Sequence, residues 1–345
     1  MWFRWFENAI SPFPEDMPEM PPQGMMAFIW HYTKPFRWML LALALFSAAA
    51  GMIEVALFNF IGTIVDWLAD TDPTSLFAER GTELVAIAIV TLVLWPLFGL
   101  VSDTIVHNGL LGNYAMQIRW RAHRYMLRQS TQFFTDDFAG RLTTKIMQTA
   151  LGVRDAVIKV TNLFVYVAVY FAGAVVLFAS ADPRLAVPIL IWLVAYFATM
   201  RHFLPKLKDV AKEQADARSA LVGRIVDAYT NIQTVKMFSS GKAEESYARN
   251  GMETMLDTVY RQMRQVTLLS VTLMVINAML ITATLGFGLW LWSRGQIQSG
   301  ALAVAGALLM RIQGMSHWFI FEVAGLFESI GSVQDGIGTV AQPIK

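Results

Sequence analysis

The chain has 345 residues, of which 55% are hydrophobic and only 15% are charged, and its formal net charge is +1. So many apolar residues with so few charges exclude an ordinary soluble globular protein, and the near-neutral balance gives no reason to expect a nucleic-acid partner. The chain contains no cysteine, which excludes disulfides, thiol catalysis and cysteine-based metal sites.

The chain begins with an aromatic-rich segment, "MWFRWFENAI", which Arg4 and Glu7 interrupt and which is too short to cross a membrane. A proline-rich stretch, "SPFPEDMPEMPP", follows it. Aromatic rings favour the membrane interface, and four of them flank Arg4: Trp2, Phe3, Trp5 and Phe6. We therefore expect residues 1–35 to form an N-terminal segment at the cytoplasmic interface, with a disordered tail as the alternative.

Six apolar stretches follow, each long enough to supply the roughly 20 residues of helix that cross a hydrocarbon core about 30 Å thick. Their expected bounds are Phe36 to Trp67, Leu84 to Gly112, Val157 to Phe178, Leu185 to Phe203, Val266 to Trp292 and Ala301 to Val323. The sequence therefore predicts an all-α membrane protein whose residues 36–325 form a domain of six transmembrane helices.

The connections between these spans alternate in length and in charge. Two are long and carry most of the lysines and arginines, namely Asn113 to Ala156 and Leu204 to Gln265. The short ones hold only Arg80, Arg184 and Arg294. By the positive-inside rule, the long connections and both termini are expected in the cytoplasm, with a bacterial inner membrane as the expected location.

The long connections have the composition of helices. The first contains "NYAMQIRWRAHRYMLRQSTQFF", which has no glycine or proline and places apolar residues at roughly helical spacing. The second contains two charged, helix-forming stretches that are separated near Ser239, Ser240 and Gly241. Because long structureless connections are uncommon, each connection is predicted to be a hairpin of two helical arms that extend the membrane helices into the cytoplasm.

The tip of the first hairpin is predicted at "DDFAGRLTTKIMQ", which runs from Asp136 to Gln148. Asp136 and Asp137 are placed to favour the N-terminus of a short helix through capping and the helix dipole. Gly140 allows another backbone to approach closely. The alternative is an ordinary solvated turn between antiparallel helices.

Six spans, two helical hairpins, "FFTDDFAGRLTTKI" at the first tip and "IVDAYTNIQTVKMF" in the second together resemble the transmembrane domain of an ABC exporter of the type IV fold. The resemblance covers the chain from about Phe28 to its end. It implies that each tip carries a coupling helix that docks on a nucleotide-binding domain. The positions that match or border the family's first coupling motif are Asp136, Asp137, Phe138, Ala139, Gly140, Arg141, Leu142 and Lys145. Those of the second are Asp227, Tyr229, Asn231, Ile232, Val235 and Lys236.

Two positions depart from the family pattern. Asn231 stands where the family often has glycine, and Thr149 stands where it often has an acidic residue. These departures weaken the assignment of individual docking contacts and leave the expected architecture unchanged.

The sequence contains no phosphate-binding loop of a nucleotide-hydrolysing domain. The nearest fragment, "FSSGKAEE", has Lys236 where the first glycine of such a loop belongs and Ala243 where the Mg²⁺-binding hydroxyl belongs. We therefore expect no catalytic residue, metal or cofactor in this chain. ATP and Mg²⁺ are expected in a nucleotide-binding domain, which either follows residues 326–345 in a longer chain or belongs to a separate polypeptide.

Ionisable residues inside the spans are candidates for a substrate pathway, because a charge in mid-membrane is costly unless it faces a polar cavity or a partner. They are Glu54, Asp103, His107, Arg311, His317 and Glu322. Arg311 is the strongest candidate, since the sixth helix borders the pathway in the family and a guanidinium suits an anionic head group. The alternative is a set of structural ion pairs, for instance Glu54 or Asp103 with Arg311.

The expected function is that of the membrane-spanning, substrate-translocating part of an ATP-driven exporter for hydrophobic or amphipathic compounds, lipids or drugs. Its expected partners are a second copy of itself, or a paralogous half-transporter, together with a nucleotide-binding domain and membrane lipids. The alternative is a proton-coupled secondary transporter that uses Glu54, Asp103, His107 and Glu322. A purely structural scaffold would leave the long helical hairpins without a role.

Overall fold

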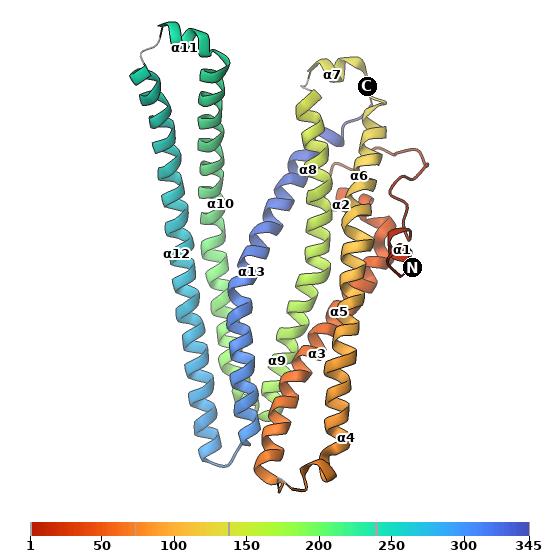
Figure 1. The fold of residues 1–345 in the computed structure, drawn as a ribbon, viewed down its shortest axis with the longest axis vertical. Helices are drawn as coiled ribbons and strands as arrows, with labels where there is room; N and C mark the ends of the chain where they lie inside the picture. The colour runs from red at the N-terminus through yellow and green to blue at the C-terminus, as the bar shows by residue number, and fades with distance from the viewer. Residues whose placement is uncertain (1, 73, 137–138, 239–240, 345) are drawn as a thin grey trace. The chain divides into compact units, whose positions relative to one another are not determined.

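The computed structural model describes residues 2–72, 74–136, 139–238 and 241–344, with side chains at 135, 136, 139–141, 215, 238 and 317 outside that description. Within the described residues every regular element is a helix (Figure 1). In chain order the elements are α1 (Trp2–Glu7), α2 (Met25–Thr33), η1 (Lys34–Phe36), α3 (Arg37–Asp70), α4 (Leu76–Ile89), η2 (Val90–Leu94), α5 (Trp95–Thr104), η3 (Ile105–Leu110), α6 (Leu111–Met126), α7 (Thr131–Asp136), α8 (Ala139–Ile158), η4 (Lys159–Phe164), α9 (Val165–Ala181), η5 (Pro183–Leu185), α10 (Ala186–Thr230), α11 (Ile232–Phe238), α12 (Gly241–Ser293) and α13 (Ser299–Val340).

Several of these elements join end to end into long continuous helices. The segments η2, η3 and η4 are short π-helical turns inside such helices. The first of them ends directly before the Trp95–Pro96 pair. Proline lacks an N–H and its ring clashes with the carbonyl four residues earlier, so a widened turn at this place lets the helix continue through Pro96.

The chain divides into two compact units. The first comprises Met1–Ala186 and Phe287–Lys345. Within it α13 packs chiefly on α8 and α3, while α3 also packs on α9. Its buried core lies mainly where α2, α3, α6, α8 and α13 meet, and its largest fully buried side chains there include Phe28, Phe36, Leu43, Tyr114 and Tyr125.

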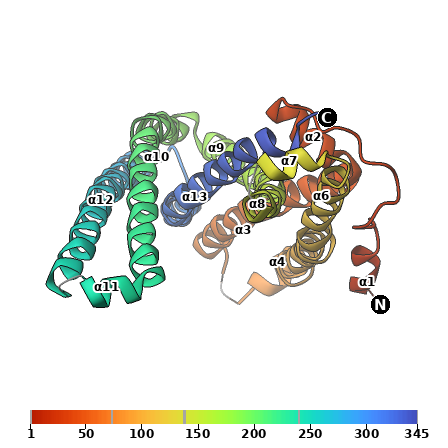
Figure 2. The same cartoon turned by 90° about the horizontal axis from the view of Figure 1, so that it is seen from above.

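The second unit, Val187–Gly286, is an antiparallel hairpin of α10 and α12 closed by α11 (Figures 1 and 2). The indole Nε1 of Trp192 donates a hydrogen bond to Oδ1 of Asn277 at 2.9 Å, and both side chains are buried. Farther along the hairpin, Arg261 pairs with Glu213 of the facing helix at 2.7 Å. Polar contacts across α10 and α12 therefore supplement their apolar packing.

Five helices are long and apolar enough to cross a membrane, judged by length and composition: Met25–Asp70, Leu76–Met126, Leu142–Ala181, Pro183–Thr230 and Gly241–Ser293. They contain the first five predicted spans, so the chain is an integral membrane protein built from helices. The predicted sixth span lies in α13, a helix of 42 residues. In the described part of the chain α13 is not among these five helices, and Arg311, Gln313 and Ser316 interrupt its apolar run. The count of six remains a prediction.

The described part of the N-terminal segment contacts the first unit. After α1, the non-helical residues 8–24 run beside α6 and receive hydrogen bonds from its side chains. In α1 the aromatic rings of Trp2, Phe3 and Trp5 are exposed, whereas Phe6 is buried in the core of the first unit. The interfacial placement of residues 1–35 stays a prediction.

Candidate functional site

Three helices of the first unit contribute to one polar cluster inside the apolar part of the chain. Nε of Arg311 in α13 donates to Oε1 of Glu54 in α3 at 2.5 Å. The hydroxyl of Tyr166 in α9 donates to the other carboxylate oxygen of Glu54 and accepts from Nη2 of Arg311 at 3.1 Å. Each residue thus contacts the other two, and the cluster joins α3, α9 and α13.

A second ion pair lies farther along α13. Nζ of Lys159 in η4 is 2.9 Å from Oε2 of Glu322. In the same π-helical turn, Asn162 accepts a hydrogen bond from the hydroxyl of Ser47 in α3 at 2.5 Å. A cavity of about 260 Å³ lies beside this pair. Its lining residues are Ile158, Lys159, Asn162, Leu163, Tyr166, Trp318 and Glu322.

The structure brings together three of the six ionisable residues that were predicted to line a pathway. Glu54, Arg311 and Glu322 all lie in the two ion-paired groups. Asp103 in α5 and His107 in η3 are exposed and form no ion pair within the described part of the chain. The side chain of His317 lies outside the described residues. Of the ion pairs named as alternatives, Glu54 with Arg311 is present and Asp103 with Arg311 is not.

These charges neutralise one another and tie α13 to its neighbours. The side chain of Glu54 is only 13% exposed, so its carboxylate depends on Arg311 and Tyr166 for hydrogen bonds. Arg311 is 42% exposed and keeps part of its guanidinium accessible. A charge removed from such a pair leaves its partner uncompensated, which costs more than the pair itself contributes. No group of three or more metal-ligating side chains occurs among the described residues.

Two members of these groups, Tyr166 and Lys159, were not singled out from the sequence. Lys159 lies within the predicted span Val157 to Phe178, so a complete search of the spans for charges finds it. Tyr166 carries no such signal, because a tyrosine in an apolar helix is usually a packing residue. Its role is visible only after α3, α9 and α13 are placed together.

At the far end of α3, its Asp66 caps the start of α13. Oδ1 of Asp66 accepts from the backbone N–H of Gly300 at 2.6 Å, which satisfies one of the unpaired amides of the first helical turn. Gly300 and Gly62 lie so close that a Cβ added to Gly300 would contact the carbonyl of Gly62 and the Asp66 carboxylate. A cavity of about 410 Å³ borders this crossing.

The short connection beside this cavity carries a fixed ion pair. Nη2 of Arg184 is 2.7 Å from Oδ2 of Asp182 and also donates to Oε1 of Gln296 at 2.7 Å. The side-chain hydrogen bonds from Arg184, together with its backbone N–H, hold the pKa of Asp182 below its ordinary value. Arg184, held by Asp182, thereby links η5 to the turn before α13.

The second predicted tip contains a short helix, α11, between the two long arms. Asn231, at the junction, donates to the carbonyl oxygen of Asp227 from its backbone N–H at 3.0 Å and from Nδ2 at 3.1 Å. Asp227, Tyr229, Asn231, Ile232 and Lys236 are exposed, and Val235 is half-buried. The side chain of Asn231 therefore adds a second hydrogen bond at the end of α10, and the tip presents apolar surface next to charge.

The first tip differs from the prediction in the position of its short helix. That helix, α7, ends at Asp136, the first residue of the predicted motif, and the helix that follows is α8 with 20 residues. Asp137 and Phe138 lie outside the described residues, as do the side chains of Asp136, Ala139, Gly140 and Arg141. Farther along α8, Leu142 is buried, whereas Lys145 pairs with Asp335 of α13 at 2.8 Å. The pair places Lys145 against α13.

Comparison with known proteins agrees with this architecture. The family model described as "ABC transporter transmembrane region" matches residues 40–315. A protein of Haemophilus influenzae named "Uncharacterized ABC transporter ATP-binding protein" is 40% identical over 343 residues, which are 99% of this chain and 55% of that protein. "Multidrug resistance protein sirA" of Leptosphaeria maculans is 28% identical over 176 residues, which are 49% of this chain and 14% of that protein.

The chain thus spans about half the length of the Haemophilus influenzae relative. The family model covers the helices that carry Glu54, Tyr166 and Arg311 and both tips. The chain therefore belongs to the family of ABC transporter transmembrane regions.

Proposed function

We propose that this chain is the substrate-translocating part of an ATP-driven exporter for hydrophobic or amphipathic compounds, and that it works by alternating access. The length of the second hairpin carries the proposal: α10 and α12 contain 45 and 53 residues, whereas about 20 residues cross the hydrocarbon core. Much of each helix therefore projects from the membrane and ends at α11. Such arms suit the transmission of force from an ATPase that binds the tips.

Several parts of this proposal concern the assembly. We propose that α13 is the sixth span, that the tips face the cytoplasm of a bacterial inner membrane, and that nucleotide-binding domains supply ATP and Mg²⁺ there. A pathway bounded by the helices of one chain would be open to lipid on one side, whereas two copies enclose a central pathway. A homodimer is thus the proposed assembly, with a paralogous half-transporter as the other possible partner.

The polar face of α13 supports an amphipathic substrate. Arg311, Trp318 and Glu322 recur at helical spacing on this helix, which places an accessible guanidinium near an aromatic ring and a carboxylate. Such a surface can contact both the head group and the apolar part of a lipid or drug. The name of the Leptosphaeria maculans relative, a multidrug resistance protein, supports the same substrate class.

Proton-coupled transport is less well supported by these contacts. A proton carrier must take up and release a proton in each cycle, yet Glu54 and Glu322 each hold a cation within hydrogen-bond distance. Protonation of either carboxylate would break an ion pair. Asp103 and His107, the other two residues of that hypothesis, lie outside the cluster.

The test is transport by the full-length natural protein in liposomes, measured with a fluorescent lipid analogue and a cationic dye. We expect movement of at least one of them to require hydrolysable ATP, to stop with a non-hydrolysable analogue and to continue when a protonophore abolishes the proton gradient. Transport that follows an imposed proton gradient without ATP would reject the proposal in favour of the proton-coupled alternative.

A further inference from the structure

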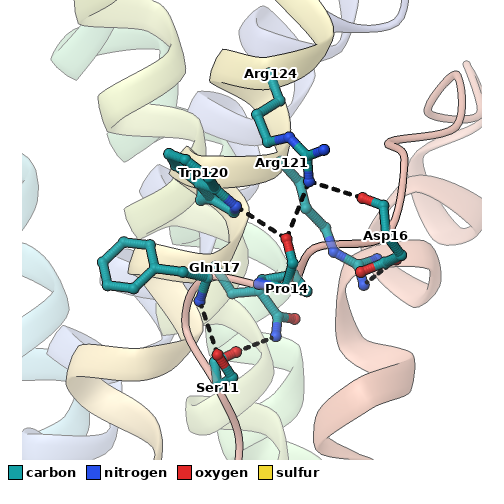
Figure 3. Close-up of polar contacts among 8 residues, drawn as sticks. Ser11, Pro14, Asp16, Gln117, Trp120, Arg121 and Arg124 are labelled. Atoms are coloured by element: carbon teal, nitrogen blue, oxygen red, sulfur yellow. Dashed lines mark hydrogen bonds and ion pairs between the residues drawn. The ribbon is translucent and has the colours of Figure 1, made fainter.

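Residues 8–24, here named the strap, lie along α6 in a way that the ABC transporter architecture does not require, since the family match begins only at residue 40. The strap meets one stripe of donors on α6 (Figure 3). Nε2 of Gln117 donates to the carbonyl oxygen of Ser11 at 2.8 Å, and Nε1 of Trp120 donates to that of Pro14 at 3.0 Å. The ring of Phe13 packs edge-on against Trp120.

Arginines extend the same stripe toward the end of α6. Nη1 of Arg124 donates to the carbonyl oxygens of Pro14 and Asp16 at 3.0 and 2.8 Å (Figure 3). Nη1 of Arg128, just after α6, donates to the carbonyl oxygen of Pro18 at 3.3 Å. Arg121 forms an ion pair with the Asp16 carboxylate at 3.0 Å. Most of these bonds are made to backbone carbonyl oxygens of the strap and not to its side chains.

The composition of the strap explains this mode of contact. It contains five prolines, Pro12, Pro14, Pro18, Pro21 and Pro22. Proline fixes φ and removes an N–H donor, so such a segment stays extended, loses little entropy on binding and exposes carbonyls with no internal partner. Grooves that bind proline-rich peptides use this property, with aromatic rings and donors set at regular spacing. On α6 the donors Gln117, Trp120 and Arg124 have the required helical spacing.

The far end of the strap reaches the C-terminal end of α13. Nε2 of Gln23 donates to the carbonyl oxygen of Ala341 at 3.3 Å. The next carbonyl, of Gln342, accepts from the Tyr125 hydroxyl at 2.6 Å and from Nε2 of Gln129 at 3.2 Å. Gln23 of the strap, Tyr125 of α6 and Gln129 just after α6 therefore hold two consecutive carbonyls at the point where α13 ends.

We propose that the strap is an intramolecular peptide ligand of α6, and that its binding fixes the end of α13 against α6. Without the strap, the carbonyl of Ala341 loses its hydrogen bond from Gln23, and the donors of α6 lose the strap carbonyls that they bind. The end of α13 then keeps only the bonds from Tyr125 and Gln129. The proposal does not depend on the substrate or on ATP hydrolysis.

The test uses the full chain in lipid nanodiscs, with spin labels on cysteines introduced into its cysteine-free sequence. One label pair, at Met17 and Met116, reports the docking of the strap, and a second pair, at Met116 and Ile344, reports the position of the end of α13. All three side chains are exposed. The double variant Trp120→Phe/Arg124→Met removes three carbonyl bonds and retains the aromatic contact with Phe13. Arg249→Met, which removes an exposed arginine from the other unit, is the matched control.

We expect narrow distance distributions for both pairs in the unchanged chain and in the control, and broadening of both by at least twofold in the double variant. Broadening of the strap pair alone would show that the strap does not fix the end of α13. No broadening of either pair would show that Trp120 and Arg124 do not hold the strap on α6. A second measurement adds a labelled peptide of residues 2–24 to a chain that lacks residues 2–22. Saturable binding that weakens at least tenfold with Arg124→Met supports the proposal, and absence of saturable binding to the folded deletion variant contradicts it.

Discussion

Two tyrosines of α9, one helical turn apart, allow a controlled test of the polar cluster. The hydroxyl of Tyr166 bonds with both Glu54 and Arg311. The hydroxyl of Tyr170 is buried and has no hydrogen-bond partner among the described residues. The same substitution, tyrosine to phenylalanine, therefore removes two charge-assisted bonds at the first position and one unsatisfied polar atom at the second.

The structure sets the size and the sign of both effects. Hydrogen bonds to charged groups contribute about 1.5–3 kcal/mol each, but Glu54 and Arg311 remain bonded to each other after Tyr166→Phe, and water reaches part of Arg311. We expect a net loss of about 1–2 kcal/mol for Tyr166→Phe. For Tyr170→Phe we expect a change between zero and a gain of about 1 kcal/mol, because the buried hydroxyl no longer has to be desolvated without a partner.

Thermal unfolding in a fixed detergent, followed by intrinsic tryptophan fluorescence at one scan rate, measures both variants. With an unfolding entropy of about 2.1 cal/mol/K per residue, a chain of 345 residues loses about 1.4 °C of midpoint per kcal/mol. Tyr166→Phe is therefore expected to lower the midpoint by roughly 1.5–3 °C. Tyr170→Phe is expected to leave it unchanged or slightly higher. Equal losses in the two variants would refute the reasoning, since the hydrogen bonds of the Tyr166 hydroxyl with Glu54 and Arg311 would then add nothing to the stability.

Three further predictions follow from the site. Gly300→Ala places a Cβ against the carbonyl of Gly62 and should lower the unfolding midpoint, whereas Gly306→Ala on the same helix enters open space and should not; equal midpoints would contradict the close helix crossing. Ile232→Asp in α11 should reduce substrate stimulation of ATP hydrolysis in the complete transporter several-fold without unfolding it, and unchanged stimulation would remove α11 from coupling. Arg311→Met should weaken transport of anionic amphiphiles more than that of cationic ones, and Arg311→Lys should retain part of the preference; equal loss for all substrates would leave Arg311 only its structural pairing with Glu54.

The helical class and the long hairpins could be predicted because both depend on local sequence. Apolar runs long enough to span a bilayer identify the first five membrane helices, and the charged, helix-forming arms on either side of α11 continue them. The predicted sixth span has a weaker signal, since Arg311 lowers the hydropathy of α13 and contacts Glu54, which is distant in sequence. One ion pair could still be named in advance, because an intramembrane carboxylate and guanidinium have few other ways to be stabilised.

Other features depend on tertiary placement and leave weak signals in the sequence. The π-helical turn η4, which carries Lys159 and Asn162 to α13 and α3, has no known composition marker in this chain. The docking of the strap uses its backbone carbonyls, which every residue has, so its prolines indicate an extended segment but not its partner. The end of α7 at Asp136 shows a third limit, because an acidic residue fits the end of one helix and the approach to the next equally well.

The central claim is that α13 borders a pathway that opens alternately to the two sides of the membrane. Gly314→Cys tests it most directly, because Gly314 is exposed on α13 close to Arg311 and a Cβ there meets no neighbour within 4 Å. The measurement is labelling of this single cysteine by a membrane-impermeant thiol reagent, added from either side of the membrane to the full-length transporter in liposomes. We predict labelling from the cytoplasmic side without nucleotide and from the opposite side when ATP hydrolysis is trapped with vanadate. Labelling from the same side in both states, with transport intact, would contradict alternating access along α13.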